Sequence, residues 1–356
     1  MRGGRSTPRS GPRPGDDRVS FTTARYTPER RADLVELLAR VGTTQLSDEE
    51  FAWWFDRNPA GEGIVSLALD GGEVVGVAAM SFFRTALNGT VTKLAIPVNV
   101  ATDPRYRGQG VFSTLERENE AAAVDAGSPL TVTFPNGASY PIFMSRLGWI
   151  DLPRLRLWAK PLRAVAVLRY VLGRAGRRGG LVQRDESTRS IRGVEVRLVE
   201  RFGPDMDALG RACAAGYGNH FVRDAEYFNW RYLDSPRDYR CFGAYRDGAL
   251  AGVAVVGHTF KHGVSAGFLA DLVIAPGGRN ALRALLSRAV AEVRGEADAL
   301  VLLPPPGGVE RRTLLAAGFA PTNKRLRFIG KELSDGARLD TRGGAWHFTL
   351  GDFDFF

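Results

Sequence analysis

The stretch DPRYRGQGV, residues 103–111, decides the fold of this chain. It follows an apolar run at 94–101 that predicts a strand, and from residue 111 to 126 apolar side chains recur at helical spacing. Gly108 and Gly110 carry no side chain that would keep a diphosphate from the backbone, and the amides at a helix N-terminus favour negative charge. The stretch therefore predicts an anion-binding turn between a strand and a helix.

These glycines also come close to the dinucleotide-binding pattern G-x-G-x-x-G, with Ser113 in place of the third glycine. A dinucleotide-binding loop follows the first strand of its domain and expects an acid about twenty residues later. Here several elements come first: a strand at 19–23, a helix at 28–41, and a hairpin at 67–70 and 74–80. This context favours another fold and leaves a plain strand-to-helix turn as the alternative.

The chain repeats itself at an offset of 177 residues, so the turn must be interpreted within a repeat. The repeated positions are Phe51, Trp53, Phe55 and Pro59, which return as Phe228, Trp230, Tyr232 and Pro236, and Asp70-Gly71, which returns as Asp247-Gly248. Further on, Leu147-Gly148-Trp149 corresponds to Ala317-Gly318-Phe319. The repeat predicts two copies of one fold. It also favours a packing role for Trp53, Trp54 and Phe55 over the alternative that they line an acceptor pocket.

At Arg105-x-x-Gly108-x-Gly110 the sequence resembles the GNAT superfamily of N-acetyltransferases, whose acyl-CoA signature is Q/R-x-x-G-x-G/A. The resemblance runs from about residue 19 to 160 and includes a strand and helix at 130–149 that end in Gly-Trp. It implies an α/β (α+β) chain of two tandem GNAT folds, each a mixed, mostly antiparallel twisted sheet flanked by helices. We expect a disordered basic tail at 1–17, an acyl-CoA-binding GNAT domain at 18–160, a basic helical linker at 161–192, and a second GNAT-like domain at 193–356.

The resemblance implies that acetyl-CoA or another acyl-CoA is the co-substrate. Its pantetheine arm would lie along a strand edge and bond backbone amides, and its diphosphate would bind the turn, with the basic side chains adding bonds to phosphate. The residues expected to contact it are Val98, Asn99 and Val100 at the strand, Arg105, Arg107, Gly108, Gln109, Gly110 and Val111 at the turn, and Asn136, which either binds pantetheine or caps the next helix. After the strand at 269–274, the second copy lacks this motif and is expected to shape the acceptor cleft.

The catalytic groups are less clear from the sequence. Many GNAT enzymes use a tyrosine as the acid at the position of Met144, so Tyr140, one helical turn earlier, is a candidate acid or else a packing aromatic. In the N-myristoyltransferase class the terminal carboxylate acts as a base. By this resemblance the Phe356 carboxylate, Asp354 or Asp352 is a candidate base, unless residues 351–356 only complete the second sheet.

The implied function is an acyl-CoA-dependent N-acyltransferase that transfers an acyl group, most often acetyl in this family, to a primary amine. The amine belongs to a small molecule, an amino sugar or a peptide and attacks the thioester directly. One alternative is a non-catalytic acyl-CoA-binding regulator, in which Met144 reflects lost catalysis. The other is a Fem-type aminoacyl transferase that uses aminoacyl-tRNA, against which the intact motif argues.

Composition limits the partners. The net charge of +9 arises from residues 1–31 and from residues 154–201, and no basic face with interleaved aromatics is evident, so no nucleic-acid partner is expected. Residues 161–178 alternate apolar and arginine side chains, as in a connector helix or, less favoured, a helix on a membrane surface. Cys213, Cys241 and the histidines have no metal-site spacing. The sequence shows neither a secretory signal nor an apolar span, and we expect a cytoplasmic enzyme.

Overall fold

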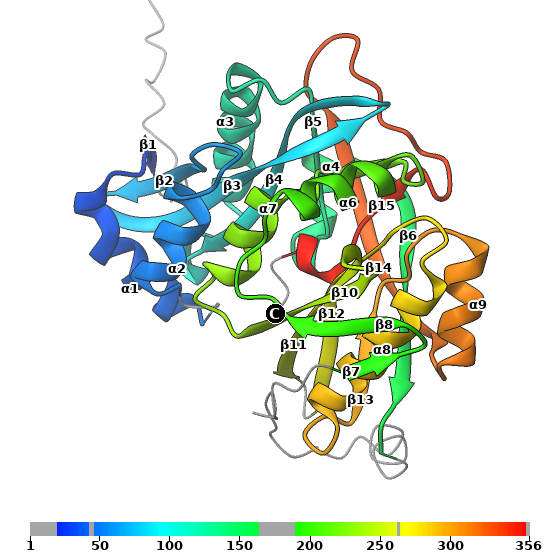
Figure 1. Cartoon of the computed structure of the whole chain (residues 1–356). Helices are drawn as coiled ribbons and strands as arrows, with labels where there is room; N and C mark the ends of the chain where they lie inside the picture. The colour runs from blue at the N-terminus through cyan, green and yellow to red at the C-terminus, as the bar shows by residue number, and fades with distance from the viewer. Residues whose placement is uncertain (1–19, 43–45, 164–188, 262–263, 354–356) are drawn as a thin grey trace, which may run out of the picture.

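The computed structural model describes residues 20–42, 46–163, 189–261 and 264–353, and their strands join in one sheet flanked by helices (Figure 1). The first half contains β1 (Thr22–Arg25), η1 (Pro28–Arg30), α1 (Arg31–Val41), α2 (Asp48–Phe51), η2 (Ala52–Asp56), β2 (Ile64–Asp70), β3 (Glu73–Leu87), β4 (Thr90–Thr102), η3 (Pro104–Tyr106), α3 (Val111–Asp125), β5 (Leu130–Thr133), α4 (Tyr140–Arg146) and β6 (Ile150–Pro161).

The second half follows a similar order, with additional short strands before β8, between its first two helices and near the C-terminus. It contains β7 (Arg189–Ile191), β8 (Val194–Leu198), α6 (Pro204–Ala214), β9 (Asn219–Phe221), α7 (Ala225–Phe228), η4 (Asn229–Leu233), β10 (Tyr239–Arg246), β11 (Ala249–Lys261), β12 (Val264–Ile274), α8 (Arg279–Val293), β13 (Ala299–Leu302), α9 (Gly308–Ala316), β14 (Ala320–Glu332), β15 (Trp346–His347) and η5 (Leu350–Asp352). The expected mixed, mostly antiparallel sheet with flanking helices is confirmed.

Local sequence explains the elements of the first half. Leu34, Leu37 and Leu38 form the buried stripe of α1, and Ser47 and Glu50 bond each other's backbone amides in a capping box that starts α2. The predicted hairpin is β2 and β3, and the predicted helix after the glycine turn is α3. These elements are confirmed.

The repeat seen in the sequence is present in the structure. Helices α2 and α7 each continue into a π-helical turn, η2 after α2 and η4 after α7. These two turns carry Trp53 and Trp230 respectively. The two indole rings stack with centroids 5.6 Å apart, so the repeated aromatics meet between the halves. Gly148 and Gly318, which follow α4 and α9, both adopt positive φ, 72° and 86°.

The two halves exchange a strand. The order across the sheet is β1-β2-β3-β4-β5-β14-β6-β13-β12-β11-β10-β8-β7, so β14 of the second half pairs with β5 of the first. In return, β6 of the first half pairs with β13 of the second, and β6 and β14 pair antiparallel in the middle. Each half of the sheet is therefore completed by a strand of the other.

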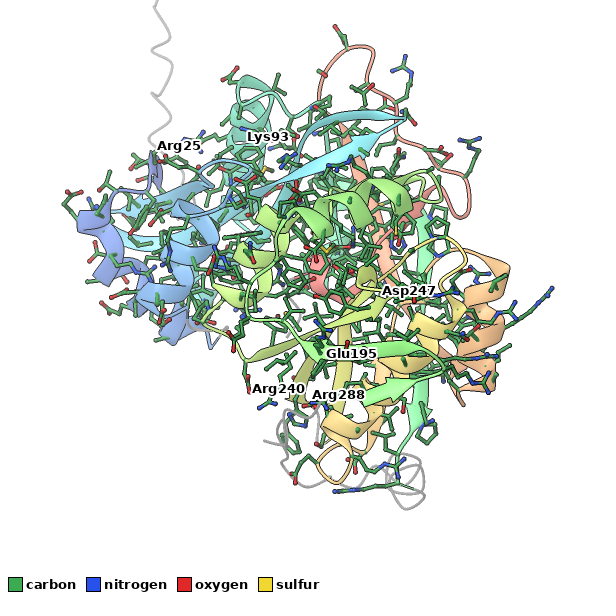
Figure 2. All side chains as sticks on the ribbon, in the orientation of Figure 1. Arg25, Lys93, Glu195, Arg240, Asp247 and Arg288 are labelled. Carbon is green, nitrogen blue, oxygen red and sulfur yellow. The ribbon has the colours of Figure 1, made fainter. Side chains whose placement is uncertain are left out.

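Charged side chains lie mostly at the periphery, and several of the buried ones are paired (Figure 2). Arg240 and Arg288, close together in Figure 2, both pair with the buried Glu292, at 3.6 and 2.6 Å. Burial of a carboxylate without such partners is strongly unfavourable. No helix in the described ranges has the length and apolar character needed to cross a membrane. The tail at 1–17 and residues 164–188 of the linker lie outside the described residues. At the ends of the expected helical linker the structure has strands instead, because Pro161 is the last residue of β6 and Arg189–Ile191 form β7.

Candidate active site

A wedge opens in the sheet where β4 and β5 separate. The two parallel strands are paired at Ala95 and Thr131, and the hydroxyls of Thr131 and Thr133 donate to the carbonyls of Ala95 and Pro97, at 3.0 and 3.3 Å. Beyond this point β4 continues to Thr102, whereas β5 ends at Thr133. One backbone edge of residues 98–100 therefore has no strand partner within the described chain. Such an edge can accept an extended ligand as an added strand.

A bulge in β4 lies at the same place. The pairing of β3 with β4 shifts register between Val77 and Ala79, so that Asn99 and Val100 lie opposite Ala78 alone. Asn99 takes the left-handed φ of 50°. A bulge of this kind bends its strand and changes the direction of the side chains at that point.

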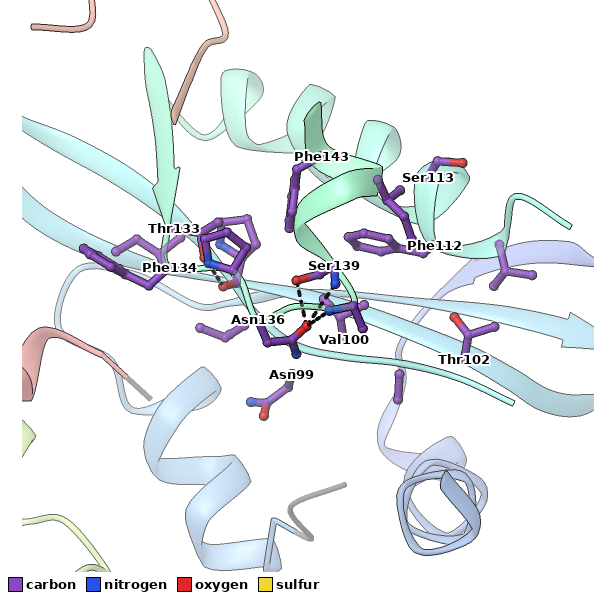
Figure 3. A pocket seen from close by; sticks show the side chains of 18 of the residues that line it. Asn99, Val100, Thr102, Phe112, Ser113, Thr133, Phe134, Asn136, Ser139 and Phe143 are labelled. Carbon is purple, nitrogen blue, oxygen red and sulfur yellow. Dashed lines mark hydrogen bonds between the residues drawn. The ribbon is translucent and has the colours of Figure 1, made fainter. Parts of the chain in front are cut away.

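A cavity of about 780 Å³ runs along the wedge (Figure 3). Its walls come from α1, η2, β3, β4, the glycine turn, the start of α3, β5, α4 and the C-terminal segment. The lining side chains include Trp54, Phe83, Val98, Asn99, Val100, Arg107, Phe112, Ser113, Phe134, Asn136, Ser139, Ile142, Phe143, Arg146, Asp352 and Phe353. The cavity thus joins most of the residues that the sequence placed around a cofactor.

The glycine turn forms one end of this cavity. Gly108 and Gly110 have φ of 80° and 88°, a conformation that strains any other residue, and Gly110 immediately precedes α3. No side chain caps α3, and its first turn holds no acidic residue. The amides at this end of α3 therefore remain available for an anion, with Arg107 and Arg146 in the same cavity lining.

Arg105 and Gln109 stabilise the turn itself. The Arg105 guanidinium donates to Asp103 at 2.9 Å and to Glu73 at 2.8 Å and is absent from the cavity lining. The hydrogen bond from Arg105 lowers the pKa of Asp103 to about 2. The side-chain amide of Gln109 donates to the carbonyl of Arg105. Arg105 and Gln109 were predicted to bind the cofactor, and in this arrangement their side chains hold the loop that presents the amides.

Tyr140 and Asn136 lie at the start of α4 but face different surroundings. The Tyr140 hydroxyl donates to Asp151 at 2.7 Å, a bond that raises its pKa, and Arg327 lies over its ring. Tyr140 does not line the cavity. Asn136 does line it, and its carbonyl oxygen accepts from the amides of Ala138 and Ser139, both at 2.9 Å. It therefore has the capping contacts that the sequence allowed.

The C-terminal segment reaches the opposite end of the cavity. Asp352, buried, accepts from Arg223 at 2.6 Å and from Tyr227 at 3.0 Å, while Arg231 donates to the carbonyls of Gly351 and Phe353. Phe353 packs on Phe134 in the cavity wall. Asp354 and Phe356 lie outside the described residues, so the proposed carboxylate base stays a prediction.

The second copy has no equivalent turn. After β12 the chain passes through Ala275–Gly278 directly into α8, without the two arginines of the first turn. The C-terminal segment lies against β12 here: a Cβ on Gly351 would lie 2.9 Å from the carbonyl oxygen of Ala270 and would collide with the Tyr232 hydroxyl. The region that corresponds to the first cavity is thus packed with the chain's own residues.

Sequence reasoning missed several cavity residues. Arg146 and Ser113 carry no motif of their own, because their position depends on how α4 approaches α3. Trp54 lines the cavity and also packs on Trp230, whereas its neighbour Trp53 stacks on Trp230 between the halves. Burial raises the pKa of Cys213 to about 11 and that of Cys241 to about 12, and neither thiol lines the cavity. Within the described ranges, no group of His, Cys, Asp or Glu is arranged to hold a metal ion.

Comparison with known proteins agrees with this geometry. Residues 24–150 match the model of the acetyltransferase (GNAT) domain, so the first half carries such a domain and the resemblance seen in the sequence is confirmed. No curated protein sequence matches the chain.

Solved structures show the same fold over most of the chain. A GCN5-related N-acetyltransferase from Anabaena variabilis has a TM-score of 0.61 at 14% identity, over 88% of this chain and 73% of that one. Saccharomyces cerevisiae N-myristoyltransferase with bound myristoyl-CoA has a TM-score of 0.59 at 13% identity, over 90% and 84%. A tandem GNAT protein from the clavulanic acid biosynthesis pathway has a TM-score of 0.55 at 15% identity, over 89% and 100%. At these identities the likeness shows the fold alone, a tandem GNAT arrangement.

Proposed function

We propose that this chain is an acyl-CoA-dependent N-acyltransferase, with acetyl as the acyl group and a primary amine of a small molecule, an amino sugar or a peptide as the acceptor. The observation that carries the proposal is the continuity of one cavity from the amides of the glycine turn to the open edge of β4. A diphosphate and an extended amide-bearing arm are the two features of CoA that such a cavity accommodates.

Different residues of the cavity would bind different parts of CoA. The amides that begin α3, together with Arg107 and Arg146, would hold the diphosphate. The edge of residues 98–100 would bond the pantetheine amides, and Phe112, Ile142 and Phe143 would contact its apolar parts. Arg105 would act through the loop rather than on the phosphate, since its guanidinium is already paired with Asp103 and Glu73.

The reaction requires a positioned amine and a path for its protons. A base takes one proton from the ammonium group, and the neutral amine then attacks the thioester carbonyl to form the C–N bond. As the C–S bond breaks, the nitrogen loses a second proton and the CoA thiolate takes up a proton, which gives the amide and free CoA. The backbone amide near Val100 would stabilise the carbonyl oxygen as it gains charge, a role supported by the position of Val100 in the cavity lining. We propose the Phe356 carboxylate as the base. This proposal is supported by Phe353, three residues earlier, which lies in the cavity wall. Tyr140 has less support as the acid, because its hydroxyl is bonded to Asp151 outside the cavity.

The test is release of free CoA from acetyl-CoA across a panel of small amines, amino sugars and N-terminal peptides, beside calorimetric titration with acetyl-CoA. We expect micromolar binding and turnover with at least one class of acceptor. Binding without turnover on any amine would favour the acyl-CoA-binding regulator. Absence of binding would overturn both, and acyl transfer from aminoacyl-tRNA instead would favour the Fem-type reaction.

A further inference from the structure

Asn99 has a backbone conformation that no turn explains. Among the described residues, positive φ occurs at four positions other than glycine: Asn88, Asn99, Arg192 and Asp247. Asn88, Arg192 and Asp247 each precede a glycine in a two-residue turn between paired strands, where this conformation is required. Asn99 instead lies inside β4, at its bulge. Such strain within a strand is maintained where it serves a site.

The side chain of Asn99 also has an unused donor. Its amide nitrogen is buried, and no hydrogen-bond acceptor of the described chain contacts it. Asn99 lines the cavity. In Figure 3 it extends away from Phe143 and Phe112, which lie on the α4 side of the strand. A buried donor without a partner destabilises the protein unless a bound ligand supplies the acceptor.

We propose that the side-chain amide of Asn99 donates a hydrogen bond to the acyl carbonyl oxygen of the bound thioester. This inference rests on the proposed function for the identity of the ligand. Asn99 is adjacent to Val100 and both residues line the cavity, so the carbonyl oxygen would receive one side-chain donor from Asn99 and one backbone donor from Val100. The left-handed bulge conformation places this donor on the side of the strand remote from the pantetheine-lining α4.

Both donors matter more as the reaction proceeds. When the amine adds to the carbonyl carbon, the π electrons move onto the oxygen, which becomes a stronger acceptor. When the C–S bond breaks, the carbonyl is restored as an amide and the electron pair leaves with sulfur. Asn99 transfers no proton in either step. Its contribution is therefore present in binding of the acyl group and larger in the rate.

The decisive experiment compares acetyl-CoA with S-ethyl-CoA, a thioether of the same size that lacks the carbonyl oxygen. The variant is Asn99→Gly, which tolerates the left-handed backbone and removes the amide. The control is Asn88→Gly, the same change at an exposed left-handed asparagine in the β3–β4 turn, away from the cavity. Calorimetric affinities for both ligands, kcat/KM and Tm are measured for all three proteins.

We expect Asn99→Gly to weaken acetyl-CoA binding about 5- to 20-fold and kcat/KM about 10- to 100-fold, with S-ethyl-CoA affinity and Tm retained. Asn88→Gly should match the wild type in all four measurements. An equal loss for both ligands, or no loss for either, would overturn the inference. If Asn99→Gly weakens binding of acetyl-CoA but not of S-ethyl-CoA, and the wild type acylates no amine, the role of Asn99 stands while the proposed enzymatic function fails. If it binds neither ligand, both fail.

Discussion

Trp53 and Trp230 exchange hydrogen bonds across the junction of the two halves. The indole N–H of Trp53 donates to the carbonyl of Trp230 at 2.6 Å, and the indole N–H of Trp230 donates to the carbonyl of Trp53 at 2.9 Å. Both residues are buried and lie 177 positions apart, which is the offset of the sequence repeat. The repeat is therefore an approximate twofold relationship whose axis passes between these two indoles.

Removal of either indole donor should destabilise the junction. Trp53→Phe or Trp230→Phe leaves a buried carbonyl without its partner, which should lower the free energy of unfolding by about 1–3 kcal/mol. Because the rings also stack, the double variant should deviate from additivity by about 0.5 kcal/mol or more. Urea unfolding measures this cycle. Trp346→Phe, whose indole donates to Asp340 within the second half, is the control and should be additive with Trp53→Phe.

A carboxylate at the glycine turn should block the cofactor. Gly110→Asp tolerates the left-handed conformation better than most residues do but places a negative charge at the start of α3. Acetyl-CoA affinity should fall at least about 100-fold, while Tm falls only by the cost of a left-handed aspartate. Gly89→Asp makes the same change at a left-handed glycine in the β3–β4 turn and should bind normally. Equal affinity in the two variants would exclude the turn as the diphosphate site.

A truncation after Phe353 tests the proposed role of the terminal carboxylate as the base. Asp352 belongs to the buried network with Arg223 and Tyr227, so a deletion that includes it would damage the fold. Removal of residues 354–356 should lower kcat at least about 100-fold while acetyl-CoA affinity and Tm stay near those of the wild type. Two glycines added after Phe356 would displace the carboxylate and should also reduce kcat. Full turnover in both proteins would rule out this base.

Glu116 should make stability depend on pH. It is fully buried in α3, and both of its carboxyl oxygens lack partners within the described chain. Burial, with a smaller effect from Glu120, raises its pKa well above the usual value. Because unfolding restores a pKa near 4.3, the folded state holds an extra proton above pH ~4, and stability falls as pH rises through that window.

Glu116→Gln removes this dependence. The variant should match the wild type at pH 4 and exceed it by on the order of 2 kcal/mol at pH 8, as measured by urea unfolding. Glu62→Gln, at an exposed position, should change neither value. A gain for Glu116→Gln that is equal at both pH values would indicate a packing effect instead.

The sequence specified what depends on local patterns. Gly108 and Gly110 indicated the turn because their left-handed backbone conformation strongly favours glycine, and the spacing of Leu34, Leu37 and Leu38 indicated α1. The repeat predicted two similar halves, since equivalent aromatics at a constant offset require equivalent surroundings. These features follow from residues close in sequence or from direct self-similarity.

Other features depend on pairing between distant residues. The alternation of polar and apolar residues in β6 and β14 indicates strands but not the strands with which they pair. The pairing of β6 with β13 and of β14 with β5 was therefore not predicted. Arg105 is the first residue of the acyl-CoA motif, but its guanidinium is paired with Glu73, which lies 32 residues earlier, and the motif does not reveal this pairing. The left-handed conformation of Asn99 is visible only once β3 and β4 are in register.

The exchange of β6 and β14 imposes an order in time on the synthesis of this protein. β5 leaves the ribosome roughly 190 residues before β14, its partner in the sheet, which at ~5–20 residues per second is a delay of about 10 to 40 s. Throughout that interval the free edge of β5 is open to pairing with another nascent chain. The sheet of the first half thus remains incomplete until the second half is synthesised. Premature termination in the linker would release a fragment prone to associate with copies of itself.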